Sequence, residues 1–330
     1  MTICNAQITG TGLYSPSRIE TNKDLNAFYG TPIKDTFDNK IGIHQRHITG
    51  DSESTADMAT NAGEKAIADA GITPEDLGLV VVATDTPEYL SPPTACVVQG
   101  RLQAVNAGAY DINGACSGFV AALDAMCRIV MSGGHRHILL IGAYNMTKFV
   151  NRANAALVPL FGDGAGAVVI SRTEEDCGFV GSKLYADGTQ YDFMGIYAGG
   201  AKYPLTPERI ANKEYMLQSL KPLPADRNIK LWPPIIAELA EKHNLKTADI
   251  DFIICTQINR WIIESVMPIL GIPMDRTICI MGEYGYTGSA CIPMALDTAR
   301  KTLNKPNKGD NVVFIASGVG LAVASALFKW

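Results

Sequence analysis

Residues 66–83, AIADAGITPEDLGLVVVA, share their plan with residues 239–256, LAEKHNLKTADIDFIICT, at an offset of 173 residues. In each stretch a helical pattern ends at Gly71 or Asn244, acidic loop residues follow, and a β-branched apolar run predicts a buried strand. Two further segments match in the same order: 114–119 with 287–292 at the same offset, and 138–141 with 312–315 one residue later. Three matches in one order predict an internal duplication.

The duplication predicts an α/β chain of two similar halves, residues 1–173 and 174–330. Their continuous apolar strands are typical of sheets that helices cover on both faces. Residues 186–224 are rich in Gly, Tyr, Lys and Pro and follow no clean period. We expect this segment to be a lid or an excursion that faces the substrate.

The composition excludes several classes of function. A net charge of −5 and the lack of any long run of Lys or Arg argue against a nucleic-acid partner. The eight cysteines contain no C-x-x-C pair and no Cys/His cluster at zinc spacing, which predicts no metal site and a location in the reducing cytoplasm. The N-terminus lacks a secretory signal, and glycines interrupt the apolar stretch 312–328, so we expect buried strands there and no membrane span.

The segment that carries chemistry is 109–134, AYDINGACSGFVAALDAMCRIVMSGG. It predicts a strand at 109–113, a turn at Gly114 and a helix from Ser117 onward. Cys116 then lies at the mouth of a helix, where unpaired N–H groups and the helix dipole lower the pKa of a thiol and make it a nucleophile. The alternative is a small buried cysteine, which is the commoner fate of free Cys.

Five motifs make the chain resemble the ketoacyl-[acyl-carrier-protein] synthase III branch of the thiolase-like superfamily over nearly its whole length. They are IGIHQRHI (41–48), SPPTACVVQ (91–99), DINGACSGF (111–119), FGDGAGAVVI (161–170) and ASGVGLAVASALF (316–328). The resemblance implies a five-layer αβαβα fold, a homodimer, no permanently bound cofactor, and an acyl group carried on Cys116 after transfer from acyl-CoA or acyl carrier protein. It also implies an oxyanion hole built from the backbone N–H of Cys116 and one at Gly318 or Val319. Losing one such donor typically costs ~3 to 4 kcal/mol.

Two catalytic positions depart from this family. The family's H-Q-A-N motif reads TQIN at residues 256–259, so Thr256 occupies the histidine position. Its G-N-T-S motif reads GYTG at residues 285–288, so Tyr286 occupies the asparagine position. Hydroxyl groups donate hydrogen bonds, but they do not change protonation near neutral pH as an imidazole does. The five histidines lie in segments that the resemblance places away from Cys116. We therefore expect Thr256 and Tyr286 to orient a thioester and to be poor acid/base groups.

A carboxylate is a candidate for the missing base. Asp85 follows the apolar run in VVVATDTPEYL, and the related hydroxymethylglutaryl-CoA synthases carry a catalytic Glu at a similar place. A carboxylate near a buried thiol acts as a general base once desolvation raises its pKa. The alternative, which the local pattern favours, is that Asp85 caps the turn before Pro87.

The resemblance also implies substrate-binding positions for the coenzyme A nucleotide, the carrier protein and the acyl chain. The residues nearest to the nucleotide positions are Phe37, Lys40 and Arg152. Those nearest to the carrier-protein position, within and after the TQIN motif, are Asn259, Arg260 and Trp261. Leu90 is nearest to the floor of the acyl pocket, which it reaches across the dimer.

One main functional hypothesis and two alternatives follow. In the main hypothesis, Cys116 takes an acyl group from acyl-CoA or acyl carrier protein and passes it to an amine, an alcohol or a stabilised carbanion, in specialised or fatty-acid-related metabolism. The first alternative is a decarboxylating 3-oxoacyl-[acyl-carrier-protein] synthase III with an atypical Cys/Thr/Tyr site. The second is a non-catalytic partner subunit of a heterodimeric synthase, which the intact Cys116 motif argues against.

Overall fold

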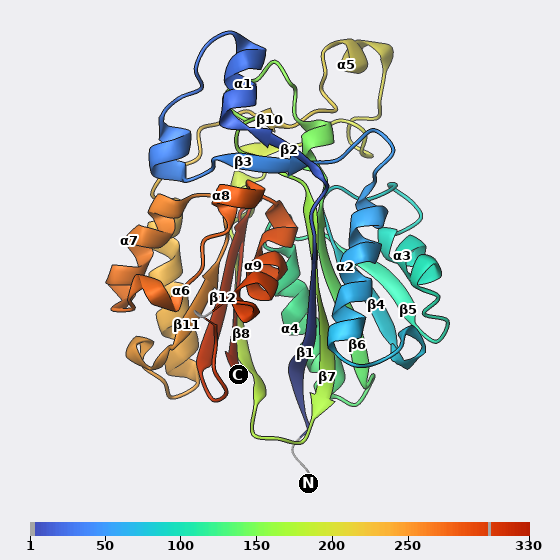
Figure 1. Cartoon of the computed structure of the whole chain (residues 1–330), viewed down its shortest axis with the longest axis vertical. Helices are drawn as coiled ribbons and strands as arrows, with labels where there is room; N and C mark the ends of the chain where they lie inside the picture. Colours follow the sequence, from blue (N-terminus) through green and yellow to red (C-terminus); the bar gives the residue numbers. More distant parts are fainter. Residues whose placement is uncertain (1–3, 303–304) are drawn as a thin grey trace.

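Two mixed β-sheets form the body of the protein (Figure 1), and the computed structural model describes residues 4–302 and 305–330. The first sheet has the strand order β1-β7-β6-β4-β5, and the second has the order β11-β12-β13-β8. The bounds of the first sheet are β1 Asn5–Tyr14, β4 Leu79–Ala83, β5 Gly108–Ile112, β6 His137–Tyr144 and β7 Gly164–Thr173. Those of the second are β8 Gly178–Ala186, β11 Phe252–Cys255, β12 Asn311–Gly318 and β13 Ala322–Lys329.

The two sheets repeat one connection pattern. β4 and β6 are parallel neighbours and β6 pairs antiparallel with β7, while β11 and β12 are parallel neighbours and β12 pairs antiparallel with β13. The segments 138–141 and 312–315, which match in sequence, occupy equivalent strands, β6 and β12. The two sheets thus share one pairing pattern, and the boundary expected after residue 173 falls between β7 and β8.

Helices form three layers around the two sheets (Figure 1). α2 and α3 cover the outer face of the first sheet, α6 and α7 cover the outer face of the second, and α4 and α9 lie between the sheets in contact with strands of both. This arrangement confirms the predicted five-layer αβαβα fold. The bounds are α2 Thr55–Asp69, α3 Thr94–Leu102, α4 Gly118–Met131, α6 Arg227–Lys242, α7 Arg260–Leu270 and α9 Cys291–Arg300.

Smaller elements cover the end of the sheets toward which β4, β5 and β6 run (Figure 1). The segment expected to be an excursion, 186–224, supplies the short helix α5 and the two-stranded pair β9 and β10 in this region. The bounds are β2 Arg18–Thr21, α1 Asn22–Tyr29, β3 Gln45–Ile48, β9 Met194–Gly195, α5 Pro207–Ala211, β10 Gln218–Ser219 and α8 Met281–Tyr284.

The apolar stretch 312–328 forms the antiparallel pair β12 and β13 in the interior of the second sheet, as predicted. The side chains of this pair are largely buried against α4 and α6. Among the residues that the structure describes, there is no helix with the length and apolar character needed to cross a bilayer.

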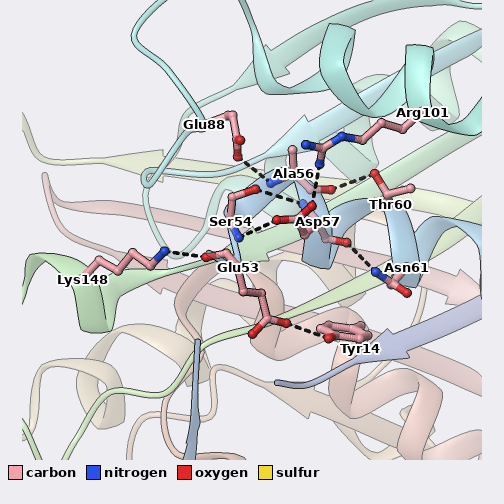
Figure 2. Close-up of polar contacts among 10 residues, drawn as sticks. All are labelled: Tyr14, Glu53, Ser54, Ala56, Asp57, Thr60, Asn61, Glu88, Arg101 and Lys148. Atoms are coloured by element: carbon pink, nitrogen blue, oxygen red, sulfur yellow. Dashed lines mark hydrogen bonds and ion pairs between the residues drawn. The ribbon is translucent and has the colours of Figure 1, made fainter. Parts of the chain in front are cut away.

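The N-terminus of α2 anchors the loop that follows β4 (Figure 2). Ser54 and Asp57 form a capping box, in which each side chain accepts a hydrogen bond from the other's backbone N–H. Glu88, from the loop after β4, accepts the backbone N–H of Ala56 at 2.9 Å. This bond holds the loop that carries Asp85 against the first turn of a long helix.

Candidate active site

A sharp turn between β5 and α4 presents Cys116. Ala115 has a left-handed φ of 47°, and the Ser117 N–H donates a hydrogen bond to the Gly114 carbonyl at 3.2 Å. A Cβ on Gly114 would lie 2.9 Å from the Cα of Gly118, so the turn requires glycine at this point. Gly118 is the first residue of α4, which begins one residue later than predicted.

The end of β12 packs directly against this turn. A Cβ added to Gly318 would lie 3.0 Å from the backbone nitrogen of Cys116, so the approach depends on the missing side chain. Gly318 and Val319 line the same cavity as Cys116. The structure thus brings together the residues expected to form the oxyanion hole.

A cavity of about 340 Å³ lies beside Cys116. Cys116 is only 8% exposed, so a substrate reaches its sulfur through this cavity. Eight of the 19 lining residues are Met, Leu, Ile or Phe, whose side chains suit an acyl chain. The polar residues of the wall are Asp85, Asn113, Tyr144, Arg227, Tyr286 and Ser317.

The protonation state of Cys116 differs from the sequence-based expectation. Burial raises the pKa of the thiol, the charge of Asp85 raises it further, and a hydrogen bond from Tyr286 lowers it only in part. The expected thiolate at a helix mouth is therefore wrong for the free protein. Desolvation shifts a fully buried group by up to about 3 to 5 pH units, whereas a helix terminus contributes about 0.3–1 kcal/mol. The thiol must lose its proton to a base before it attacks.

Asp85 is placed where such a base is needed. Its Oδ1 atom is buried and has no hydrogen-bond partner, and burial raises the pKa of the carboxyl to about 6. The turn before Pro87 is closed by Thr84, whose hydroxyl accepts the Thr86 N–H at 3.0 Å. The capping that the local pattern favoured for Asp85 is thus performed by a neighbour, and the carboxylate faces the cavity of Cys116.

Tyr286 lies against the nucleophile, but Thr256 does not. Tyr286 lines the cavity, and its hydroxyl forms a hydrogen bond with Cys116. The Thr256 hydroxyl accepts the backbone N–H of Ser317 at 3.0 Å, and Thr256 is buried outside the set of lining residues. This geometry gives Thr256 contact with the residue before Gly318 rather than with a bound thioester.

Tyr144 and Arg227 are among the cavity residues that the sequence-based prediction did not include. Tyr144 ends β6, and its ring centroid lies 6.3 Å from that of Tyr286. A Cβ on residue 288 would lie 2.2 Å from the Tyr144 ring, so the glycine at this position makes room for the ring. Its signal was available, because ligands bind beyond the carboxyl ends of parallel strands and Tyr144 ends such a strand. Arg227 follows the aperiodic segment 186–224, where the sequence holds no comparable signal.

Three of the expected substrate-binding residues, Lys40, Arg260 and Trp261, lie near one another. The Lys40 ammonium lies 4.0 Å from the centroid of the Trp261 ring, and a Cβ on Gly42 would lie 3.0 Å from Arg260. Arg260 and Trp261 begin α7, two and three residues after the cavity residue Ile258. We call Lys40, Arg260 and Trp261 the basic corner. Asn259 serves as the N-cap of α7, accepting the Trp261 N–H at 3.0 Å.

The other expected substrate residues have different surroundings. Phe37 is 5% exposed and belongs to the hydrophobic core, so the expectation that it grips a nucleotide is wrong: apolar packing has taken the ring. Arg152 forms two hydrogen bonds with Glu20, at 2.9 and 2.7 Å. Leu90 is 84% exposed and lies outside the cavity of its own chain.

The cysteines and other ligating side chains do not assemble elsewhere in the described chain. All eight cysteines are free. Residues 4–302 and 305–330 contain no group of three or more His, Cys, Asp or Glu side chains that could hold a metal ion.

Comparison with known proteins gives consistent matches. Two sequence profiles match, described as 3-Oxoacyl-[acyl-carrier-protein (ACP)] synthase III at residues 110–188 and its C-terminal domain at residues 240–330. The chain is 38% identical over 326 residues to the beta-ketoacyl-[acyl-carrier-protein] synthase III of Caldanaerobacter subterraneus subsp. tengcongensis, covering 98% of each protein. The structure resembles the 3-oxoacyl-[acyl-carrier-protein] synthase III of Aquifex aeolicus with a TM-score of 0.84 and 32% identity, covering 98% of this chain and 100% of that one. It also resembles the priming β-ketosynthase of the R1128 polyketide pathway, with a TM-score of 0.87 and 28% identity, covering 98% and 96%.

Proposed function

The chain belongs to the 3-oxoacyl-[acyl-carrier-protein] synthase III family of acyl-transferring condensing enzymes, and from this premise we propose that it transfers acyl groups through Cys116 with Asp85 as general base. The observation that carries the proposal is the shared cavity, which is lined both by Cys116, whose thiol pKa burial raises, and by Asp85, whose buried Oδ1 atom has no hydrogen-bond partner. A buried carboxylate with a pKa of about 6 is matched to proton transfer near neutral pH.

In the first half-reaction, the Cys116 sulfur attacks the carbonyl carbon of an acyl thioester. Asp85 accepts the thiol proton as the S–C bond forms, and the carbonyl oxygen becomes an alkoxide. When the tetrahedral intermediate collapses, the S–C bond to the donor breaks and Asp85 returns the proton to the departing thiol. The products are acyl-Cys116 and free coenzyme A or carrier-protein thiol.

In the second half-reaction, an acceptor X–H attacks the acyl-Cys116 carbonyl. Asp85 takes the proton from X as the X–C bond forms and gives it to the Cys116 sulfur as the S–C bond breaks, which regenerates the thiol. An amine, an alcohol or a carbon acid whose carbanion is stabilised by its own carbonyl groups satisfies this chemistry. Such acceptors suit a role in specialised or fatty-acid-related metabolism.

Backbone and side-chain donors support the developing charge in this proposal. The N–H groups of Cys116 and of Gly318 or Val319 form the oxyanion hole, which the close approach at Gly318 supports. The Tyr286 hydroxyl stabilises the Cys116 thiolate through its hydrogen bond. Thr256 acts as a positioning residue, because its hydroxyl holds the Ser317 N–H beside Gly318.

We assign donor binding to the basic corner. Its two cations and indole ring suit the phosphates and adenine of coenzyme A or the acidic surface of a carrier protein. Asn259 shapes this corner by capping α7. Arg152 contributes only if a phosphate replaces its Glu20 partner. The reaction needs no permanently bound cofactor, and the cytoplasm, where such thioesters occur, is the proposed location.

A homodimer completes the proposed site. β5 is the edge strand of the first sheet, Tyr110 on this strand is 36% exposed and Val105 shortly before it is 72% exposed, while Leu90, in the loop between β4 and α3, is 84% exposed. An unpaired apolar edge is a template for pairing with a second copy. Leu90 would then lie at the acyl-pocket floor of the partner subunit, as the resemblance implies.

The two alternatives receive less support from the site. Decarboxylation leaves an enolate that needs two strong donors, and of the two residues at the family's donor positions only Tyr286 lines the cavity, whereas Thr256 does not. A non-catalytic partner subunit does not need a cavity with a nucleophile, a base and an oxyanion hole. We therefore retain acyl transfer to an activated acceptor.

Intact-protein mass spectrometry tests the proposal. The protein is incubated with a panel of acyl-CoA and acyl-carrier-protein thioesters, and the mass of one acyl group is expected on wild type and none on Cys116→Ala. Acylated protein is then mixed with malonyl-carrier protein, and no carbon dioxide release above the Cys116→Ala blank is expected. Absence of any acyl mass across the panel would refute acyl transfer, and Cys116-dependent release would favour the decarboxylating alternative.

A further inference from the structure

Arg227 places an uncompensated positive charge in the cavity of the nucleophile. It is the first residue of α6 and lines the cavity together with Cys116 and Tyr286. Within the described ranges, its guanidinium forms no ion pair and no hydrogen bond. Arg152 and Arg260, in contrast, are paired with Glu20 and Glu264.

Partial burial of Arg227 carries a desolvation cost that a bound anion would offset. Partial burial lowers the pKa of the guanidinium, whereas ionised Cys116 or Tyr286 would raise it. A desolvated charge without a partner costs free energy, so a buried cation is normally matched by an anion. The only carboxylate among the lining residues of the described chain is Asp85, and it forms no ion pair with Arg227.

Cys116 thus has separate acidic and basic neighbours. Asp85 raises the pKa of the thiol, and the Cys116 sulfur in turn influences the pKa of Arg227. The wall is otherwise mostly apolar, which strengthens an ion pair formed inside it. A guanidinium holds a carboxylate with two parallel hydrogen bonds, a geometry that also orients the bound molecule.

We propose that Arg227 binds a carboxylate of the substrate that reacts at Cys116, so that the enzyme selects substrates carrying this group. The inference rests on the proposed function and names the chemistry of its substrate. The carboxylate comes either from the far end of the acyl group or from the acceptor. Both sources place the same anion on the same guanidinium, and each is tested separately.

The experiment uses pairs of substrates that differ only in the carboxylate. In the donor arm, Cys116 acylation rates are measured with glutaryl-CoA and pentanoyl-CoA. In the acceptor arm, pentanoyl-enzyme is mixed with 3-oxooctanoate or its methyl ester, and loss of the acyl mass is followed. Wild type is expected to prefer the carboxylate by at least about tenfold in one arm, the ratio that a charge-assisted pair supplies.

Variants of Arg227 assign that preference to the guanidinium. Arg227→Met is expected to bring the ratio close to one, and Arg227→Lys to retain part of it. Lys242→Met, at the exposed end of the same helix, is the matched control and is expected to keep the wild-type ratio. A wild-type ratio below about twofold in both arms, or an unchanged ratio in Arg227→Met, overturns the inference.

Binding separates this inference from the proposed function. Two proteins are used for calorimetry, the Cys116→Ala variant and the double variant that also carries Arg227→Met. Each is titrated with glutaryl-CoA and with pentanoyl-CoA, and then with 3-oxooctanoate and with its methyl ester. Labelling of Cys116 by pentanoyl-CoA without any carboxylate preference supports acyl transfer and overturns the inference. Carboxylate-selective binding that depends on Arg227, without labelling by any thioester, supports the inference and refutes acyl transfer.

Discussion

Asp85 and Cys116 reach one cavity from the carboxyl ends of two neighbouring parallel strands, β4 and β5, which pair through Ala83 and Ile112. Asp85 follows the first strand by two residues and Cys116 follows the second by four. The carboxylate raises the pKa of the thiol, and burial raises the pKa of both groups. Near neutral pH the thiol therefore keeps its proton, while the carboxyl, with a pKa of about 6, is mostly ionised and able to accept it.

Replacing Asp85 with Asn is expected to slow acylation of Cys116 by about 10²-fold or more, because the thiol loses its proton acceptor. Mass-spectrometric time courses with one acyl-CoA measure the rate. Glu75→Gln, an exposed acid in the same half of the chain, is the control and is expected to react at the wild-type rate. A rate for Asp85→Asn within about twofold of wild type would remove Asp85 from the mechanism.

The acylation rate is expected to rise with pH around a midpoint near 6, the pKa to which burial raises Asp85. Only the ionised carboxylate accepts a proton, so the rate is low below this pKa and reaches a plateau above it. The measurement is the initial acylation rate across the pH range. Asp85→Asn should lack the inflection, and its persistence in that variant would assign it to another group.

Asp85 is expected to lower stability as pH rises. Its pKa is raised from 3.8 in the unfolded chain to about 6 in the folded one, so between these values the folded state binds more protons and the free energy of unfolding falls with increasing pH. Asp85→Asn should therefore be more stable than wild type above about pH 7, by roughly 1–3 kcal/mol, and the gain should shrink toward about pH 4. Urea unfolding at both pH values measures this difference, and a gain independent of pH would contradict it.

Tyr286→Phe is expected to slow acylation by about 10- to 100-fold, because the thiolate loses one hydrogen bond. The ring and its packing against Phe161 and Tyr144 remain. Alkylation of Cys116 by iodoacetamide across a pH series provides a second readout, in which the thiol pKa should move upward. Tyr284→Phe, outside the cavity, should change neither measurement.

Thr256→Val is expected to act on stability more than on chemistry. The variant leaves the buried Ser317 N–H without its acceptor, which costs about 1–3 kcal/mol in the free energy of unfolding. Thr256→Ser keeps the hydroxyl and should restore both stability and rate. If Thr256→Val slowed acylation as strongly as Asp85→Asn while remaining equally stable, Thr256 would contact the substrate.

The expected site was most accurate where a local pattern was sufficient. The strand, turn and helix around Cys116 follow from apolar spacing and glycines within one short segment, and the structure places β5 one residue earlier and the start of α4 one residue later than predicted. Phe37 was misplaced because its five-residue helical turn, Phe37–Ile41, directs the ring into the core while Lys40 reaches the surface. A family resemblance does not specify which side chain of such a short turn is buried and which is exposed.

The sequence by itself determined the duplicated α/β plan and the turn that presents Cys116, because periodicity and glycine preferences are short-range properties of the chain. Only the tertiary structure decided the ionisation of that sulfur and the identity of its neighbours. A pKa depends on solvent exclusion and on nearby charges, and here the sheet brings residues 85, 227, 286 and 318 to the nucleophile from distant segments. No local pattern contains that information, since none of these contacts lies within one element.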